Sequence, residues 1–176
     1  SWKVAQLRDL IREINAGYSA KSRDRTIQDG EKGVLKVSAA TQETFQRKEH
    51  KAVLPEAEDD VKTYPRAGDW SMRRSNGTES RVGACVYVEQ DYPRLYLPDT
   101  LWQIRVEDGV SARWFNYALA SERMRAKIRG EAYGTSGMKK LSMRRLRGLR
   151  IGVPPVEEQR QIAEILGVCD HLIEQV

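Results

Sequence analysis

The sequence of 176 residues contains few side chains suited to metal binding or nucleophilic chemistry. It has two cysteines, Cys85 and Cys169, and two histidines, His50 and His171. The cysteines lie in separate apolar runs, which is typical of buried, reduced thiols rather than of a disulfide framework. The histidines lack the neighbouring Cys and His residues that a zinc site needs. The sequence therefore predicts no metal and no cofactor.

Long apolar runs are also missing. No stretch approaches the roughly 18–20 residues of a membrane span, and no basic segment followed by an apolar one marks a secretory leader. Hydrophobic residues make up 40% and charged residues 31% of the chain, as in globular proteins rather than disordered ones. We expect a cytoplasmic protein with one ordinary hydrophobic core and no membrane contact.

Familiar catalytic motifs are absent from the sequence. It has no Gly-Lys pair followed by Ser or Thr and no Gly-x-Ser-x-Gly elbow. Asp59 and Asp60, with Glu56 and Lys62 nearby, are the best candidates for a carboxylate cluster. They fall in the polar stretch 41–66, where no strand is predicted to hold them. The sequence favours a binding protein without catalysis of its own, and a metal-dependent nuclease or modification enzyme is the alternative.

Positive charge is concentrated in residues 121–150. This segment holds ten Lys and Arg residues and two acidic residues, Glu122 and Glu131. Its formal net charge is therefore +8, whereas the net charge of the whole chain is +5. A local excess of this size is typical of a surface that binds nucleic acid. The alternative is a solvated, arginine-rich helix face.

Two short segments have the residue types that contact nucleic acids. Residues 134–137 (Gly-Thr-Ser-Gly) let a backbone approach a phosphate closely, and Lys139 and Lys140 follow at once. A plain turn with exposed lysines is equally consistent with this pattern. The second segment is residues 73–76, where arginine and asparagine could read guanine and adenine edges. Arginine near a turn is common, so this signal is weak by itself.

Periodicity predicts an opening helix over residues 2–15, because Leu7, Leu10, Ile11 and Ile14 follow helical spacing. Residues 15–17 would end this helix. Residues 17–32 are predicted to be an exposed loop. Strands are expected at 33–38, 70–74, 84–88, 95–97 and 101–106, with a turn at 75–77. Short extended pieces are expected at 140–143 and 149–153, on either side of a basic loop.

Two further helices are predicted. Ser111 would cap the first, whose stripe runs through Tyr117, Ser121, Met124 and Ile128, and the glycine at position 130 would end it. The second begins near Pro155, which suits a first helical turn. Its apolar positions follow 3-4-3-4 spacing, as in a coiled-coil seam. They are Ile162, Ile165, Cys169, Leu172 and Val176.

This seam is still running at Val176. The helix is therefore expected to be either cut short or completed by another chain. The alternative is an ordinary amphipathic helix folded onto its own core, because little more than two heptads are visible.

Several segments, in this order and spacing, resemble one family. They are residues 33–39 (Gly-Val-Leu-Lys-Val-Ser-Ala), 68–69 (Gly-Asp) leading to Arg74 and Asn76, 96–99 (Tyr-Leu-Pro-Asp), 134–142 and 153–163. Together they cover nearly the whole chain. The sequence resembles a target-recognition half of the DNA specificity subunit of type I restriction–modification enzymes.

The resemblance implies an α+β fold: a mixed β-sheet target-recognition domain with flanking helices over residues 1–153, then a coiled-coil-like helix that starts the spacer at 154–176. Family members typically carry two such domains joined by paired antiparallel helices, whereas this chain has one. The sequence leaves open whether it is a fragment, a truncated product or a half-subunit that dimerises.

The resemblance also implies sequence-specific recognition of one half of a split site in double-stranded DNA, without catalysis. The implied partners are DNA, a methyltransferase subunit, a restriction subunit and a second copy paired through the final helix. An RNA-binding adaptor is a further alternative. The residues expected at DNA are Lys21, Arg23, Lys36, Ser38, Arg73, Arg74, Asn76, Tyr133, Thr135, Ser136, Lys139 and Lys140.

Overall fold

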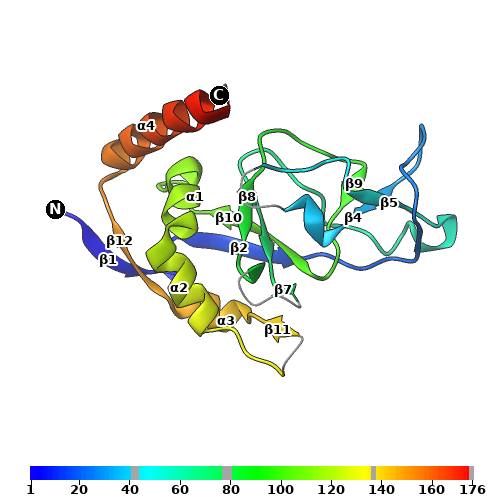
Figure 1. Cartoon of the computed structure of the whole chain (residues 1–176), viewed down its shortest axis with the longest axis horizontal. Helices are drawn as coiled ribbons and strands as arrows, with labels where there is room; N and C mark the ends of the chain where they lie inside the picture. Colours follow the sequence, from blue (N-terminus) through cyan, green and yellow to red (C-terminus); the bar gives the residue numbers. More distant parts are fainter. Residues whose placement is uncertain (41–43, 77–80, 136–137, 175–176) are drawn as a thin grey trace.

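A computed structural model describes residues 1–40, 44–76, 81–135 and 138–174 of the chain, which form an elongated molecule (Figure 1). The strands are β1 (Lys3–Gln6), β2 (Ile11–Ala16), β3 (Ser22–Arg23), β4 (Gly33–Leu35), β5 (His50–Val53), β6 (Trp70–Arg73), β7 (Ser75–Asn76), β8 (Cys85–Tyr87), β9 (Leu95–Tyr96), β10 (Leu101–Val106), β11 (Lys139–Lys140) and β12 (Arg150–Val153). The helices are α1 (Ala112–Ala120), α2 (Glu122–Gly130), α3 (Met143–Gly148) and α4 (Val156–Glu174), with 3₁₀ turns at Leu7–Asp9, Val37–Ala39 and Pro55–Ala57.

The main core lies between the helices and an antiparallel sheet with strand order β2-β10-β6-β8. Trp70 and Trp102 from this sheet are buried together with Phe115 of α1, and the Trp70 and Phe115 rings lie 4.8 Å apart. Alternation along β10 points Trp102, Ile104 and Val106 into this core, as the sequence predicts. Figure 1 shows α1 and α2 beside one end of the sheet.

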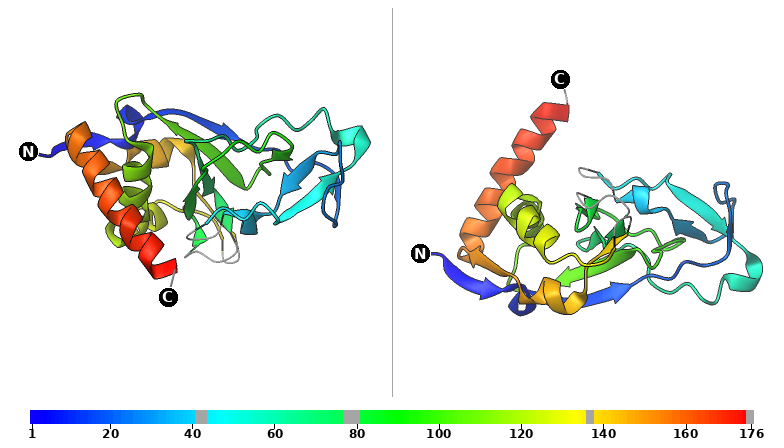
Figure 2. Two further views of the ribbon diagram at one scale, coloured as in Figure 1. Left: turned by 90° about the horizontal axis from the view of Figure 1, so that it is seen from above. Right: turned by 60° about the horizontal axis from the view of Figure 1, so that its bottom comes forward.

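A second sheet forms the far end of the molecule, with strand order β3-β5-β4-β9. Its β4–β9 pair is parallel and its other pairs are antiparallel, so this sheet is mixed. Two smaller cores cover it: one around Leu35 and Leu97, which includes Val86 and Leu101 of the main sheet, and one around Val34 and Val53. Figure 2 shows this sheet extending away from the helices. The α+β fold class with a mixed sheet is confirmed.

The helix predicted over residues 2–15 is wrong. This segment forms β1, a 3₁₀ turn and β2. The turn buries Leu7 and brings Ile11 to the same core, which imitates helical spacing in the sequence. β2 pairs with β10, for example with Ile14 opposite Ile104. These long-range contacts favour a strand over a helix in this segment. The expected helix end at residues 15–17 is likewise the end of β2.

Ser111 caps α1 as predicted, accepting a hydrogen bond from the Trp114 amide at 3.3 Å. The single helix expected after it is, however, two helices. Ser121 does not continue the apolar stripe but caps α2, accepting from the Met124 amide at 3.4 Å. A serine hydroxyl that bonds to the backbone favours a cap over a helix interior. Gly130 ends α2 as expected.

The other predicted strands are largely confirmed, since β6, β8, β9 and β10 fall at the expected places. The expected run at 33–38 is a strand only to Leu35. The polar stretches hid more structure than predicted: β3 lies in 17–32, β5 and a 3₁₀ turn lie in 41–66, and the expected basic loop contains α3. Residues 75–76 form β7, and Gly77 of the expected turn lies outside the described residues.

An ion-pair network fixes the strand that carries the Gly68-Asp69 motif. Asp69 is buried, and its carboxylate accepts two hydrogen bonds of 2.8 Å from Arg105 of β10. Arg105 also contacts Glu13 of β2 at 3.1 Å. The hydrogen bond to Asp69 is the main cause of the raised pKa of Arg105. This motif therefore contributes a structural link between three strands.

Cys85 is buried as expected, but Cys169 is exposed on α4, so the expectation of two buried thiols is half wrong. Among the described residues, no helix has both the length and the apolar character to cross a membrane.

Candidate nucleic-acid interface

Two segments far apart in the sequence form a small antiparallel ribbon, β7 with β11. Asn76 pairs with Lys139, and Ser75 pairs with Lys140. The amide that follows β11 donates a hydrogen bond of 2.9 Å to the carbonyl that precedes β7. Figure 1 shows this ribbon below the main sheet. The structure thus brings together the two segments that the sequence singles out.

The turn before β11 is tight. Tyr133 and Lys140 exchange backbone hydrogen bonds of 2.9 and 2.8 Å. Gly134 has a φ of 132°, and a Cβ atom there would lie 2.3 Å from the Met138 carbonyl oxygen. Glycine is therefore required at this position. The Arg145 guanidinium lies 5.1 Å from the centre of the Tyr133 ring, so α3 supports the turn.

The ribbon presents side chains that suit DNA. Tyr133, Thr135 and Lys140 are exposed, and Lys139 is half-buried. Both lysines have ammonium groups without a hydrogen bond or ion pair to any residue in the described ranges, so they are available to phosphates. Ser136, which was also expected at DNA, lies outside the described residues, and Asn76 is placed by its backbone alone.

The adjacent arginines of this region have different environments. Arg74 is half-buried, and its guanidinium lies 5.9 Å from the centre of the Trp102 ring. Arg73 is 5% exposed and donates from Nε to the Ala40 carbonyl at 2.6 Å. The expectation that Arg73 contacts DNA remains a prediction, but most of its side chain is inside the protein.

The remaining residues expected at DNA belong to the second sheet. Lys21 immediately precedes β3 and Arg23 ends it, and both are exposed. Lys36 contacts Asp24 at 3.1 Å, and the hydrogen bond from this lysine is the main cause of the lowered pKa of Asp24. The Ser38 hydroxyl donates to Glu49 at 2.6 Å. The structure therefore gives Lys36 and Ser38 intramolecular partners, and all four residues lie in or close to β3 and β4 of the second sheet rather than at the β7–β11 ribbon.

The ten cations of residues 121–150 are divided between internal and exposed roles. Five hold the fold together: Arg125, Lys127 and Arg147 donate to backbone carbonyls, Arg129 pairs with Glu122 at 2.7 Å, and Arg145 binds Glu131. Five have side chains without a hydrogen bond or ion pair to the described part of the chain: Arg123, Lys139, Lys140, Arg144 and Arg150.

Two of these exposed cations lie away from the ribbon. Arg123 and Arg150 line a groove of about 740 Å³ together with Trp2, Met124 and Leu166. The groove lies between the β1–β12 pair, α1, α2 and α4, and Trp2 is 54% exposed in it. The single basic surface expected from the sequence is therefore two surfaces.

Helix α4 uses only part of its apolar surface on its own domain. Ile162 packs against the main core, whereas Ile165 and Leu172 are 65% and 57% exposed. Cys169 is also exposed, and Val176 lies outside the described residues. Val168, which the predicted seam omitted, is 61% exposed beside them. The expected seam is therefore split between an inward residue and an outward stripe.

Polar contacts, which the seam did not indicate, fix α4 to the domain. Gln159 is 2% exposed; its side chain accepts from the Ser111 amide at 2.9 Å and donates to the Pro154 carbonyl at 2.9 Å. Further along, the Tyr117 hydroxyl donates to Asp170 at 2.6 Å. Burial, and then this carboxylate, raise the pKa of Tyr117 to about 12.

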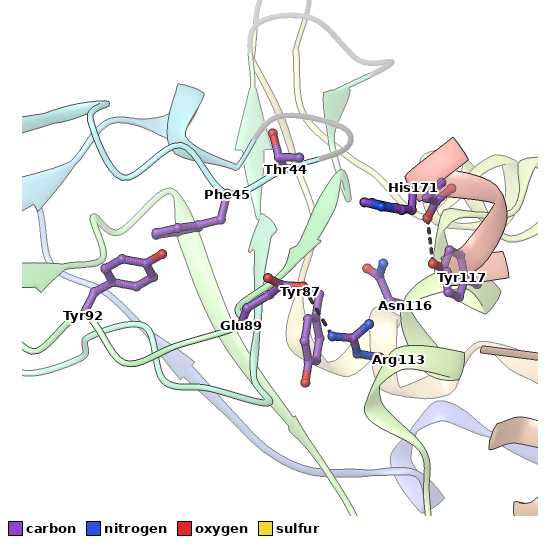
Figure 3. A pocket seen from close by; sticks show the side chains of 11 residues that line it. Thr44, Phe45, Tyr87, Glu89, Tyr92, Arg113, Asn116, Tyr117 and His171 are labelled. Atoms are coloured by element: carbon purple, nitrogen blue, oxygen red, sulfur yellow. Dashed lines mark hydrogen bonds and ion pairs between the residues drawn. The ribbon is translucent and has the colours of Figure 1, made fainter. Parts of the chain in front are cut away.

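A pocket of about 540 Å³ lies between α1, α4 and the strand end after β8 (Figure 3). Glu89 contacts Arg113 at 3.4 Å, and Arg113 lies over the Tyr87 ring. Across the pocket the Phe45 and Tyr92 rings lie 5.0 Å apart. Its lining combines the carboxylates of Glu89 and Asp170 with the guanidinium of Arg113, so it has no excess of cations for phosphates and we do not assign it to the DNA surface.

The acidic stretch proposed for the alternative nuclease is exposed. Glu56, Asp59 and Asp60 all lie at the surface next to the 3₁₀ turn at Pro55–Ala57. Within the described residues, no three His, Cys, Asp or Glu side chains are grouped so that they could hold a metal ion.

Comparison with known proteins identifies the fold and family. The sequence pattern of the type I restriction modification DNA specificity domain matches residues 1–175. No curated protein matches the chain.

Solved structures with the same fold include two specificity subunits. The S subunit of a type-I restriction-modification system from M. genitalium has a TM-score of 0.66 at 14% identity, and the HsdS subunit from Thermoanaerobacter tengcongensis has a TM-score of 0.64 at 18% identity. A third structure, from work on complex assembly and conformational transition of the type I R-M system, has a TM-score of 0.67 at 16% identity. Each match covers 99% of this chain and 38–40% of the other, so this chain spans about two fifths of those structures.

Proposed function

The chain belongs to the type I restriction–modification DNA specificity domain family, and from this membership we propose that it reads one half of a split target in duplex DNA. The β7–β11 ribbon is the observation that carries the proposal, because it joins Arg74 and Asn76 to Lys139 and Lys140.

We assign different tasks to the two strands of the ribbon. Lys139 and Lys140 follow a glycine turn, and their ammonium groups have no partner among the described residues, so they suit phosphate contacts that position the duplex. Arg74 is held over the Trp102 ring, and an arginine held in place can read a guanine edge bidentately. Asn76 is the expected adenine reader.

Competition between randomised duplexes tests this division. Lys139→Ala with Lys140→Ala should weaken binding to all sequences alike. Arg74→Ala should relax preference at one base pair, by about 1–3 kcal/mol. Arg160→Ala on α4 is the matched control, and it should change neither the overall affinity for duplexes nor the preference at any base pair. An equal loss at every position for both sets of variants contradicts the assignment, and a preference for single strands favours an RNA-binding adaptor.

We also propose that α4 is the site of contact with other subunits. Ile165, Val168 and Leu172 form an exposed apolar stripe, and such surfaces usually mark interfaces. In this proposal the stripe pairs with a second copy or an equivalent helix, and the paired helices dock a methyltransferase subunit, which supplies the chemistry. A restriction subunit joins the full complex, and the protein acts in the cytoplasm.

Sedimentation velocity tests the pairing of α4. Wild-type protein should self-associate weakly, since short helices are marginal without packing. Ile165→Asp should abolish association and leave the fold unchanged, because this side chain is 65% exposed. Gln161→Asp, which adds the same charge at another exposed position of α4, is the control. A strict monomer at high concentration would contradict pairing through this stripe.

A further inference from the structure

Three arginines from three segments converge beneath the β7–β11 ribbon. Arg73 ends β6, Arg81 precedes β8, and Arg125 lies on α2. The backbones of the first two segments are bonded directly: the Arg73 amide donates to the Ala84 carbonyl at 2.7 Å, and the Gly83 amide donates to the Arg73 carbonyl at 2.8 Å. The Arg125 guanidinium reaches the same place, where its Nη1 donates to the Val82 carbonyl at 3.2 Å.

Arg73 is held at Nε and has further donors on its two Nη groups. It is 5% exposed, and within the described residues the one hydrogen bond of its side chain runs from Nε to the Ala40 carbonyl, at 2.6 Å. Its two Nη groups are thus left with donors directed at no described partner. A guanidinium has five donors in a fixed fork, so these Nη groups can donate to a bound anion.

Burial and the repulsion of two neighbouring cations disfavour the charged form of Arg73. Burial lowers the pKa of Arg73, and the charges of Arg81 and Arg125 lower it further. Burial also lowers the pKa of Arg125, as does the charge of Arg129, whereas the Glu122 carboxylate raises it. The nearby Cys85 thiol cannot balance these cations, because burial raises its pKa to about 12 and keeps it neutral.

We propose that Arg73, Arg81 and Arg125 form a binding site for one phosphate group of the DNA backbone. Guanidinium forks match the oxygens of a phosphate and form charge-assisted hydrogen bonds to it. Arg81 is exposed and gives the site its open side, whereas Arg73 and Arg125 form its floor. Because Arg74 follows Arg73 directly, a phosphate held here fixes the register of the β7–β11 ribbon on the duplex.

This inference rests on the proposed DNA recognition, and its first test does not require DNA. Inorganic phosphate should raise the thermal unfolding midpoint of the full chain more than chloride does at the same ionic strength. Arg81→Gln and Arg73→Lys should reduce that difference, whereas Arg160→Gln on α4 should keep it. An equal response of wild type and both site variants to phosphate overturns the anion site.

The second test distinguishes a backbone phosphate from free phosphate. A target duplex with a single neutral methylphosphonate linkage, moved position by position, should lose about tenfold in affinity for wild type at one linkage. Arg81→Gln should show a similar loss with the unmodified duplex and no further loss at that linkage, since the two changes remove one interaction. For Arg81→Gln, the negative slope of log affinity against log salt should become shallower by about 0.9.

The outcomes separate this inference from the proposed function. If wild type binds duplexes specifically but Arg81→Gln binds as tightly, only the phosphate site is wrong. If wild type prefers no duplex sequence but still responds to phosphate through Arg73 and Arg81, the DNA reading is wrong and the site takes free phosphate instead.

Discussion

At the residue scale, Gly83 determines whether α2 can approach the sheet. Its φ is +73°, and a Cβ atom there would lie 2.2 Å from Cγ2 of Ile128. Gly83→Ala should destabilise the fold by roughly 2–4 kcal/mol, because backbone strain and overpacking add. Chemical denaturation measures this. Gly109→Ala is the control, since no atom lies within 4 Å of that position. Equal stability of the two variants would show that α2 does not pack as described.

A second residue-scale effect concerns pH. Hydrogen bonds from the Arg25 guanidinium, and then from the Gln28 amide, lower the pKa of Glu31 from 4.5 to about 2. A carboxylate with a lowered folded-state pKa stabilises the fold above its unfolded pKa, and this stabilisation is lost as pH falls through the folded value. Stability should therefore decline between pH 4.5 and 2.

Glu31→Gln should remove that part of the decline, and Glu56→Gln serves as an exposed carboxylate control. Titration of the Glu31 carboxyl by NMR gives the pKa directly. A Glu31 midpoint near 4.5 would contradict the contacts with Arg25.

At the element scale, α4 is anchored by one polar side chain more than by its apolar seam. Gln159 is buried and bridges the Ser111 amide and the Pro154 carbonyl, which ties the start of α4 to the start of α1. Gln159→Ala leaves both backbone groups without this partner and should cost about 1–3 kcal/mol. Gln161→Ala, two residues on and exposed, should change stability by less than about 0.5 kcal/mol. Equal unfolding midpoints for the two variants in denaturant would show that the bridge does not anchor α4.

The elements that depend on local sequence could be predicted, and those that depend on distant pairing could not. The cap at Ser111, the helix end at Gly130 and strand β10 were predicted correctly. Each depends on residues that are close together in the sequence, such as the alternation along 101–106. In contrast, residues 3–16 have helical spacing, but β12 and β10 supply partners that make them strands. Propensity is a weak prior against such tertiary pairing.

The candidate site follows the same rule. Residues 73–76 and 134–140 could be selected by residue type, but their pairing across more than sixty residues is visible only in the structure. The inward direction of Arg73 follows from strand alternation, which buries one arginine and half-exposes the next. Arg125 lies three residues before Ile128 on the buried face of α2, a spacing that could have indicated its inward position.

At the scale of the whole molecule, the basic segment serves two surfaces, and salt dependence can separate them. Lys139, Lys140 and Arg144 lie in or just after the ribbon and have no side-chain partner within the described ranges, and Arg74 and Arg81 are close to it in the sequence. If these five meet phosphates, the slope of log affinity against log salt should be roughly −4.5, at about −0.9 for each contact. Arg123 and Arg150 instead line the groove beside Trp2, away from the ribbon.

Two double variants measured from low to moderate salt therefore give different results. Lys139→Ala with Lys140→Ala should make the slope shallower by about 1.8, since two phosphate contacts are lost. Arg123→Gln with Arg150→Gln removes the same charge and should leave the slope unchanged. If both pairs shift the slope equally, the cations form one continuous DNA surface, and the groove beside Trp2 is part of it. If wild type shows no slope, DNA binding does not depend on these cations at all.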